Sequence, residues 1–175
     1  MGFFTDWGST EEERARTYPC DHQVPGASSA LYRAVDIAAP PSLVFCWLCQ
    51  LRVAPYSYDW LDNGGRQSPR ARDPANEQLA IGDSVMKIFR LVELERDHHL
   101  TLVLAPPSRY GEVAVTYQVT PAPSGSRLVV KVASRLCLRL LHPLLAVGDL
   151  VMMRKQLLTL KELAEHEVET SSRLG

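Results

Sequence analysis

The second half of the chain constrains the fold most, because a series of extended segments there gives way to one long helix. The segments 85–94, 100–104, 113–120 and 127–136 are rich in apolar and β-branched residues, and short links with turn-forming residues separate them. Strands at this spacing, joined by short links, are typical of an antiparallel meander. We therefore predict four consecutive antiparallel strands in this half.

Apolar and polar residues alternate along the third and fourth of these segments. Their shared apolar face consists of Val113, Val115, Tyr117, Val119, Leu128, Val130, Val132 and Ser134. Alternation with a period of two indicates that one side of a sheet is covered and the other side is in water.

Helix-forming residues continue from 144 to about 168. An apolar stripe with spacings of three and four residues runs along this helix: Leu150, Met153, Leu157, Leu160 and Ala164. The stripe predicts that the helix covers the sheet, which gives an α+β fold with a curved antiparallel sheet wrapped around a long C-terminal helix. A sheet that bends around a helix leaves an apolar hollow, and small molecules bind in such hollows.

Shorter elements precede the meander. Thr10 and Glu13 have the spacing of a capping box, which predicts a short helix there. The stretch 20–29 is irregular, and the alternating segment 32–37 predicts a strand. A helix is expected from the proline pair before Ser42 to about residue 51, since proline is tolerated in the first turn of a helix.

A chain of 175 residues normally forms one domain and buries about two thirds of its unfolded surface. We expect three parts: an N-terminal capping segment with a short helix (1–29), a ligand-binding domain (30–168) and a frayed tail (169–175).

The charge balance and the apolar segments exclude some classes of function. The formal net charge is −1, which argues against nucleic-acid binding, because that needs clustered excess Lys and Arg. The start of the chain is acidic, unlike a secretory signal, and charged or helix-breaking residues interrupt the most apolar stretch, 136–153. We expect a soluble, cytoplasmic protein without a membrane span.

Four cysteines occur, at Cys20, Cys46, Cys49 and Cys137. Cys46 and Cys49 have redox-motif spacing, but they lie inside an apolar run instead of at a strand–helix junction. No second pair completes a zinc site, so we expect buried, reduced cysteines.

Several motifs together resemble the START-related, helix-grip superfamily called SRPBCC. They are Trp7–Glu13 with Pro19–Asp21, Tyr32–Pro41, Trp47–Leu51, Tyr56–Asn63 and Leu79–Asp83. The similarity covers nearly the whole chain, and it is closest to the polyketide cyclase/dehydratase-like subgroup. Glycine is usual before the aromatic cluster in that subgroup and a histidine after it, whereas this chain has Leu51–Pro55 and Arg66–Arg70 there.

The resemblance implies that the segment PYSYDWLDN crosses the mouth of a cavity. Tyr56, Tyr58 and Trp60 combine an apolar ring with a polar tip, which suits a half-wet rim, and Asp59 can accept a hydrogen bond from either tyrosine. The alternative is that these rings plug the gap between helix and sheet.

Four residues are candidates for catalysis. Asp59 lies between rings that can desolvate it and raise its pKa, and Tyr58 stands beside it. Tyr117 lies on the inward, apolar face of its strand, where its hydroxyl can polarise a ligand carbonyl. Arg90 can bind a carboxylate or enolate if its side of strand 85–94 faces inward. The alternative roles are helix capping or rim structure for Asp59, a core tyrosine bonded to the backbone for Tyr117, and a solvated strand charge for Arg90.

The remaining candidates are apolar or aromatic ligand contacts: Tyr56, Trp60, Trp47, Phe89, Val115, Val130, Val132, Leu150, Met153 and Leu157. The pair His98-His99 lies in a predicted hairpin turn with no third ligand at metal spacing, so we expect neither a metal nor another cofactor.

Two functions fit these features. The protein is either an enzyme of the lyase or isomerase type that cyclises or dehydrates a polyketide-like or aromatic molecule, or a carrier or sensor of a lipid or hydrophobic metabolite. A third possibility is an interaction protein whose cavity is filled by its own side chains. We expect a small hydrophobic molecule as partner and a monomer or homodimer.

Overall fold

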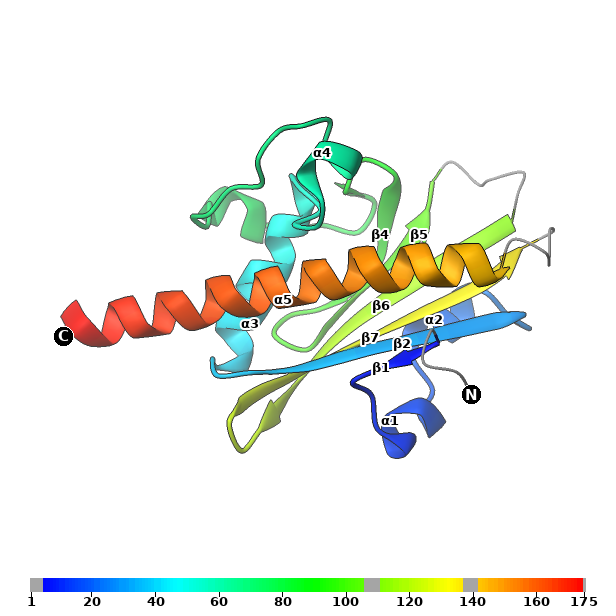
Figure 1. Ribbon diagram of the computed structural model, residues 1–175, viewed down its shortest axis with the longest axis horizontal. Helices are drawn as coiled ribbons and strands as arrows, with labels where there is room; N and C mark the ends of the chain where they lie inside the picture. Colours follow the sequence, from blue (N-terminus) through cyan, green and yellow to red (C-terminus); the bar gives the residue numbers. More distant parts are fainter. Residues whose placement is uncertain (1–4, 106–110, 137–141, 175) are drawn as a thin grey trace.

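The computed structural model describes residues 5–105, 111–136 and 142–174. Within them, a seven-stranded sheet with the order β1-β2-β7-β6-β5-β4-β3 lies against the long helix α5 (His142–Leu174) (Figure 1). The strands are β1 Asp6–Trp7, β2 Ser29–Ile37, β3 Ser84–Val85, β4 Phe89–Glu95, β5 His99–Leu104, β6 Gly111–Ala122 and β7 Gly125–Leu136. All neighbouring pairs are antiparallel except β1 and β2. The predicted α+β, helix-grip architecture is confirmed.

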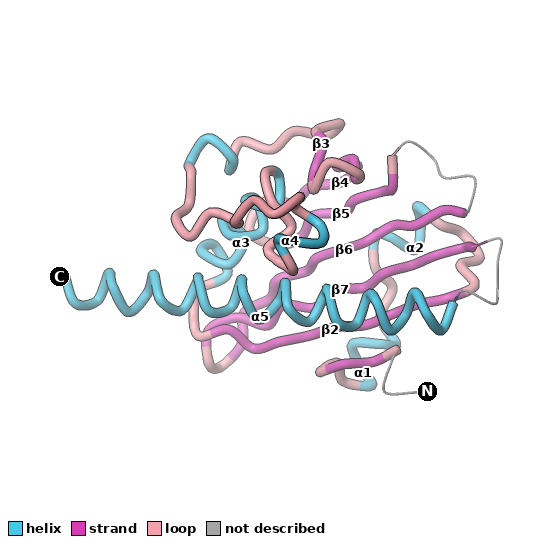
Figure 2. The backbone as a smooth tube through the Cα atoms, turned by 45° about the horizontal axis from the view of Figure 1, so that its top comes forward, coloured by secondary structure: helices cyan, strands magenta, loops and turns pink. Residues whose placement is uncertain are grey.

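The other helices lie on both sides of the sheet. They are α1 Glu11–Ala15, α2 Pro19–Gln23, α3 Pro41–Cys49 and α4 Asp59–Asp62, with 3-10 turns at Gln50–Arg52 and Pro74–Glu77. Figure 2 shows α5 crossing the sheet, with α3, α4 and the intervening loops beside it. α2 packs on the opposite face, against β5, β6 and β7. The sheet is therefore a middle layer.

The predicted capping box at the start of α1 is confirmed. The Thr10 hydroxyl accepts a hydrogen bond from the Glu13 amide at 3.2 Å, and the Glu13 carboxylate accepts one from the Thr10 amide at 2.8 Å. The same carboxylate pairs with Arg127 on β7 at 2.8 Å. Glu13 therefore ties α1 to the sheet as well as closing its first turn.

Replacing Thr10 with Ala is expected to lower the free energy of unfolding by about 1 kcal/mol, because the Glu13 amide loses its acceptor. Urea denaturation measures this loss. Thr170→Ala is the matched control, since its exposed hydroxyl only bonds back to the His166 carbonyl of its own helix. An equal loss in both variants would contradict the capping role.

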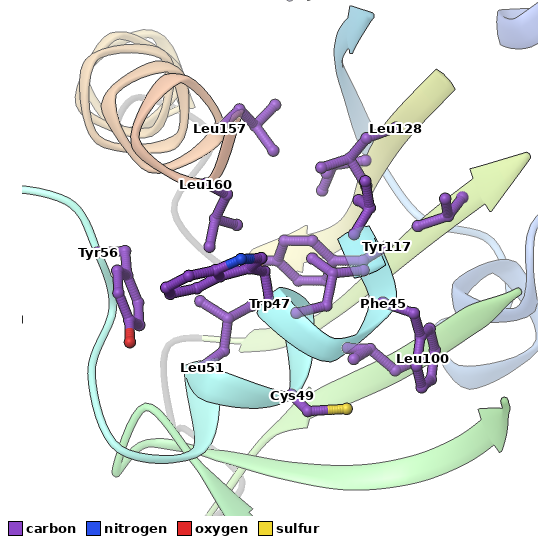
Figure 3. Packing of buried hydrophobic residues seen from close by; sticks show 14 of the residues in the cluster. Phe45, Trp47, Cys49, Leu51, Tyr56, Leu100, Tyr117, Leu128, Leu157 and Leu160 are labelled. Carbon is purple, nitrogen blue, oxygen red and sulfur yellow. The ribbon is translucent and has the colours of Figure 1, made fainter. Parts of the chain in front are cut away.

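The main core lies between the sheet, α3 and α5. The inward residues of β6 and β7 follow the predicted alternation, and Val115, Tyr117, Leu128 and Val130 are almost completely buried there. The α5 stripe meets them through Leu157 and Leu160 (Figure 3). This burial fixes the register of the strands, since a shift of one residue would turn every inward side chain outward.

The expectation that the other face of the sheet is in water is wrong for its central strands. α2 covers that face, and a second apolar cluster forms there from Tyr18, Cys20, Val24, Tyr32, Ala34, Ala114, Val129 and Ala133. Lys131 is held over it by an ion pair of 2.7 Å with Asp21 of α2. The stretch 20–29, predicted to be irregular, thus includes most of α2, and this helix forms the second apolar cluster with the outer face of the sheet.

The prediction of one continuous strand over 85–94 is also wrong. Met86 and Lys87 have φ angles of +50° and +66°, in the left-handed region, so the chain turns between β3 and β4. The Met86 amide donates to the Leu51 carbonyl at 3.0 Å, which holds this turn against the 3-10 turn Gln50–Arg52 that follows α3. Met and Lys are not turn-forming residue types, so the sequence carried no signal for it.

Smaller differences concern the ends of elements. α5 continues to Leu174 instead of ending near 168, so residues 169–174 of the predicted frayed tail are helical. Of the described cysteines, Cys20 and Cys49 are buried and free, as predicted, whereas Cys46 is only half-buried; Cys137 lies outside the described residues. Among the described helices, none has an apolar stretch long enough to cross a membrane.

Candidate ligand pocket

A pocket of about 390 Å³ lies between the N-terminal half of α5 and the sheet, and we call it the α5 pocket. Strands β4, β6 and β7, the β3–β4 turn, the segment before α4 and one face of α5 form its wall. The lining residues are Pro55, Ser57, Met86, Lys87, Ile88, Phe89, Val113, Val115, Tyr117, Val132, Asp149, Met152, Met153 and Gln156. Most of these side chains are apolar, and a few polar groups converge among them.

Tyr117 is the polar group on the sheet side. Its hydroxyl donates to Gln156 Oε1 at 2.8 Å, and Gln156 Nε2 donates to the Pro55 carbonyl at 2.6 Å. Burial raises the pKa of Tyr117 far above its usual value, and the negative charge of Asp149 acts in the same direction. The phenol therefore stays protonated and can only offer a neutral hydrogen bond.

Asp149 is the acidic group on the helix side. Arg33, whose side chain is fully buried on β2, places Nη2 3.0 Å from Asp149 Oδ2. Burial raises the pKa of Asp149 to about 6, and the Arg33 charge opposes this rise. Among the described residues, none completes a well-aligned hydrogen bond to Oδ2. At neutral pH the group is a carboxylate close to its own pKa, which suits proton transfer.

Arg33 is itself fixed by the backbone around it. Its Nη1 donates to the Thr5 and Tyr32 carbonyls, both at 2.8 Å. Burial lowers the pKa of the guanidinium, and Asp149 and Asp6 oppose that effect. Arg33 thus places a fixed positive charge next to the Asp149 carboxylate.

The pocket brings together five of the residues singled out from the sequence. Tyr117, Phe89, Val115, Val132 and Met153 all line it. They come from β4, β6, β7 and α5; the alternation places Val115, Tyr117 and Val132 on the inward face, whereas the sequence leaves open which face of segment 85–94, with Phe89, points inward.

Two candidate acid–base residues lie elsewhere. The Asp59 carboxylate accepts hydrogen bonds from the Ser68 amide at 2.8 Å and from the Ser68 hydroxyl, so it closes the loop after α4. Tyr58 lines a surface groove with Trp7, on a different side of α5 from the pocket. Neither side chain reaches Tyr117 or Asp149 in the pocket wall.

Arg90 and Trp60 are exposed. Arg90 lies between Ser84 and Val103 in the sheet register, next to Phe89, whose side chain lines the pocket. Because successive residues of a strand point to opposite faces, Arg90 points away from the pocket. Trp60, 74% exposed, projects into solvent from α4.

Tyr56 and Trp47 form part of the main core. Their rings meet edge to face with centroids 6.2 Å apart, and the Trp47 indole donates to Glu167 of α5 at 3.0 Å (Figure 3). Tyr56 has a φ angle of +56°, which turns its ring inward, and burial raises its pKa to about 12. This placement matches the plug alternative for Tyr56.

Three further ligand-contact candidates lie outside the pocket lining. Val130 and Leu157 are completely buried in the main core, and Leu150 lines the groove beside Trp7.

Sequence reasoning missed Asp149, Arg33, Gln156 and Met86. Asp149 offered one signal, as an acid within the apolar run 136–153. Arg33 offered another, as a charge on the same strand face as Leu31 and Val35. Nothing in the sequence connects these two residues, because 116 positions separate them.

Comparison with known proteins supports the fold. No protein-family model matches the chain, and no curated protein matches it in sequence. A solved protein of Rhodobacter sphaeroides is similar with a TM-score of 0.52 and 18% identity, over 83% of this chain and 95% of that chain. One of Nitrosospira multiformis has a TM-score of 0.52 and 11% identity, over 80% of this chain and 99% of that chain.

A third similar structure is StfQ, the di-domain ARO/CYC of the steffimycin biosynthetic pathway. Its TM-score is 0.50 with 13% identity, over 80% of this chain and 52% of StfQ. The chain therefore shares its helix-grip fold with these three structures.

Proposed function

We propose that the α5 pocket binds a small hydrophobic molecule, polyketide-like or aromatic, and assists its cyclisation or dehydration. The observation that carries this proposal is the pairing of an apolar pocket with a phenol and a carboxylate whose pKa is about 6. The volume of about 390 Å³ falls in the usual range for small-molecule sites. The likeness to StfQ supports the same class of ligand.

The proposed chemistry divides between two side chains. The Asp149 carboxylate removes a proton from a carbon between two carbonyl groups, and the Tyr117 hydroxyl turns from Gln156 Oε1 to donate to the oxygen that gains negative charge. The resulting enolate carbon bonds to a second carbonyl of the same chain. The Asp149 proton passes to the new alkoxide and makes it a hydroxyl. For dehydration, Asp149 takes the second proton from the same carbon and delivers it to this hydroxyl, which leaves as water, so no oxidant or reductant is needed.

The remaining rate acceleration comes from the shape of the α5 pocket. The apolar walls hold a flexible chain so that its reacting carbons meet, which removes much of the entropic barrier. The left-handed Met86 and Lys87 at the wall fit this role, because residues in sparsely populated conformations tend to cluster at ligand sites.

One observation favours a second candidate, a carrier or sensor of a lipid. Lys87 lines the pocket and offers a cation to a fatty carboxylate, while the apolar wall accommodates the chain. Binding without turnover would use the same space. The oligomeric state, a monomer or a homodimer, remains a prediction from the sequence.

Fluorescence titration with 1-anilinonaphthalene-8-sulfonate tests ligand binding, followed by displacement with 1,8-dihydroxyanthraquinone or lauric acid. We expect saturable binding and stronger displacement by the anthraquinone. Val115→Trp fills the pocket and should weaken binding of the dye at least tenfold. Val151→Trp is the matched control, because Val151 is exposed on the groove side of α5.

Both variants are checked for folding by circular dichroism. Equal dye affinity of Val115→Trp and wild type would overturn the proposed pocket. Stronger displacement by lauric acid would favour the carrier over the enzyme.

A further inference from the structure

The turn between β4 and β5 gathers three side chains that can bind a metal. They are Glu95, at the end of β4, His98, the last residue of the turn, and His99, the first residue of β5. Asp97 has a φ angle of +61°, which closes the turn tightly enough to bring the glutamate back over the histidine pair. The sequence showed two adjacent histidines without a third ligand, and the turn supplies it.

The three candidate ligand atoms form a nearly equilateral triangle. His98 Nδ1 lies 3.1 Å from Glu95 Oε2 and 3.1 Å from His99 Nδ1, and the third side, from His99 Nδ1 to Glu95 Oε2, is 3.5 Å. Tetrahedral zinc with bonds of about 2.0–2.1 Å separates its ligand atoms by about 3.4 Å. The triangle therefore has the size of one face of a zinc tetrahedron.

The atoms behind His99 fix its tautomer for metal binding. His99 Nε2 lies 3.1 Å from Glu93 Oε1, and an ionised carboxylate only accepts hydrogen bonds. Nε2 therefore carries the proton, and the Nδ1 lone pair of neutral His99 points at Glu95 and His98. A carboxylate behind a ligating histidine is the usual outer partner in metal sites.

His98 has a polar partner as well. Its Nε2 lies 3.2 Å from the Gln118 side-chain amide on β6. With the amide nitrogen facing the ring, His98 Nδ1 keeps a proton, which lies between Glu95 and His99. When the Gln118 amide is rotated, its oxygen faces the ring and accepts a hydrogen bond from His98 Nε2–H. His98 Nδ1 then carries no proton, and its lone pair can bind a cation.

We propose that Glu95, His98 and His99 form a binding site for a divalent transition ion, with Zn²⁺ as the expected occupant. Two imidazoles and a carboxylate are a ligand set that zinc takes in open, three-ligand sites. Glu95 and His98 are partly exposed, which leaves the fourth position open to water. The site shares no residue with the α5 pocket, so it stands independently of the proposed function.

Calorimetric titration of the untagged, chelator-treated protein with ZnCl₂ tests the proposal. We expect one ion per chain. Glu95→Gln and His98→Ala should each weaken binding by more than about 100-fold, because loss of an outer partner alone typically costs 10–100-fold. Glu93→Gln, which changes only the outer partner, should weaken it by about tenfold.

His166→Ala is the matched control, since His166 is exposed on α5, and it should bind zinc like the wild type. Co²⁺ substitution reports the ligands: nitrogen and oxygen coordination gives visible absorption without the intense near-ultraviolet thiolate band. Absence of saturable binding, unchanged affinity in His98→Ala, or a thiolate band that assigns the ion to cysteines would each overturn the proposal.

Discussion

Replacing Arg33 with Met is expected to lower the free energy of unfolding by about 3 kcal/mol. Arg33 has a fully buried side chain and lies 3.0 Å from Asp149. Removing one partner of a buried ion pair leaves the other charge uncompensated, which costs about 3–5 kcal/mol. The lower end applies because the Asp149 side chain is 22% exposed. Urea denaturation at neutral pH measures the loss.

Two further variants separate the ion pair from general damage. Arg33→Met combined with Asp149→Leu removes both charges and should recover most of the lost stability, since apolar replacement of a buried pair is often neutral. Arg135→Met removes a pair with Glu112 in which both side chains are 52% exposed, and it should cost less than about 1 kcal/mol. A loss in Arg33→Met no larger than in Arg135→Met would contradict the role of the buried pair.

Replacing Asp149 with Asn is expected to lower kcat/KM by a factor of about 10²–10⁴, the usual contribution of a positioned acid or base. A thioester of a linear poly-β-ketone is the substrate for the assay. The dye affinity of the pocket should change only a few-fold, because Asn has nearly the same shape as Asp. Full turnover by Asp149→Asn would exclude the proposed base.

The pH profile gives this experiment a second readout. The pKa of Asp149 is about 6, raised by burial, and the base form is the carboxylate. Wild-type kcat/KM should therefore rise with pH through about 6, and this limb should be absent in Asp149→Asn. Tyr117 adds no limb below neutral pH, since burial moves its pKa upward.

The same shift predicts a pH dependence of stability. An acid whose pKa is higher in the folded state than its usual value of 3.8 binds protons more tightly when folded. Its favourable contribution is complete below about pH 4 and is lost as the pH rises through about 6. Asp149→Asn should remove this slope from urea midpoints measured across that interval.

The meander and the long helix were predictable because their signals are local. The alternation along β6 placed Val115 and Tyr117 on the inward face, and the helical stripe placed Met153 opposite them. Both rest on periods of two or about 3.6 residues, which any packed sheet or helix must obey.

The pocket acid was not predictable, because it depends on contacts between distant parts of the chain. Asp149 becomes a candidate only when β2 brings Arg33 behind it and β6 brings Tyr117 in front. The β3–β4 turn is similar, because the Leu51 carbonyl and tertiary packing hold Met86 in a conformation that its residue type does not favour.

The three rings of the aromatic cluster 56–60 do not form one site. Tyr56 enters the core, Tyr58 lies in the surface groove, and Trp60 points into solvent. Asp59 lies among them but bonds to Ser68 in the next loop. Their closeness in sequence suggested one site, whereas the left-handed conformation of Tyr56 and the start of α4 after Tyr58 direct the three rings differently.

The sheet serves as a shared wall between two compartments, and this limits how relatives of the chain can diverge. β6 gives Val115 and Tyr117 to the pocket, and Ala114 and Thr116 to the layer under α2. Losing or gaining one residue within this strand would exchange the two sets and disrupt both compartments at once. New ligand preferences can therefore arise along β6 only by substitution, whereas changes of length are confined to the loops beyond its ends.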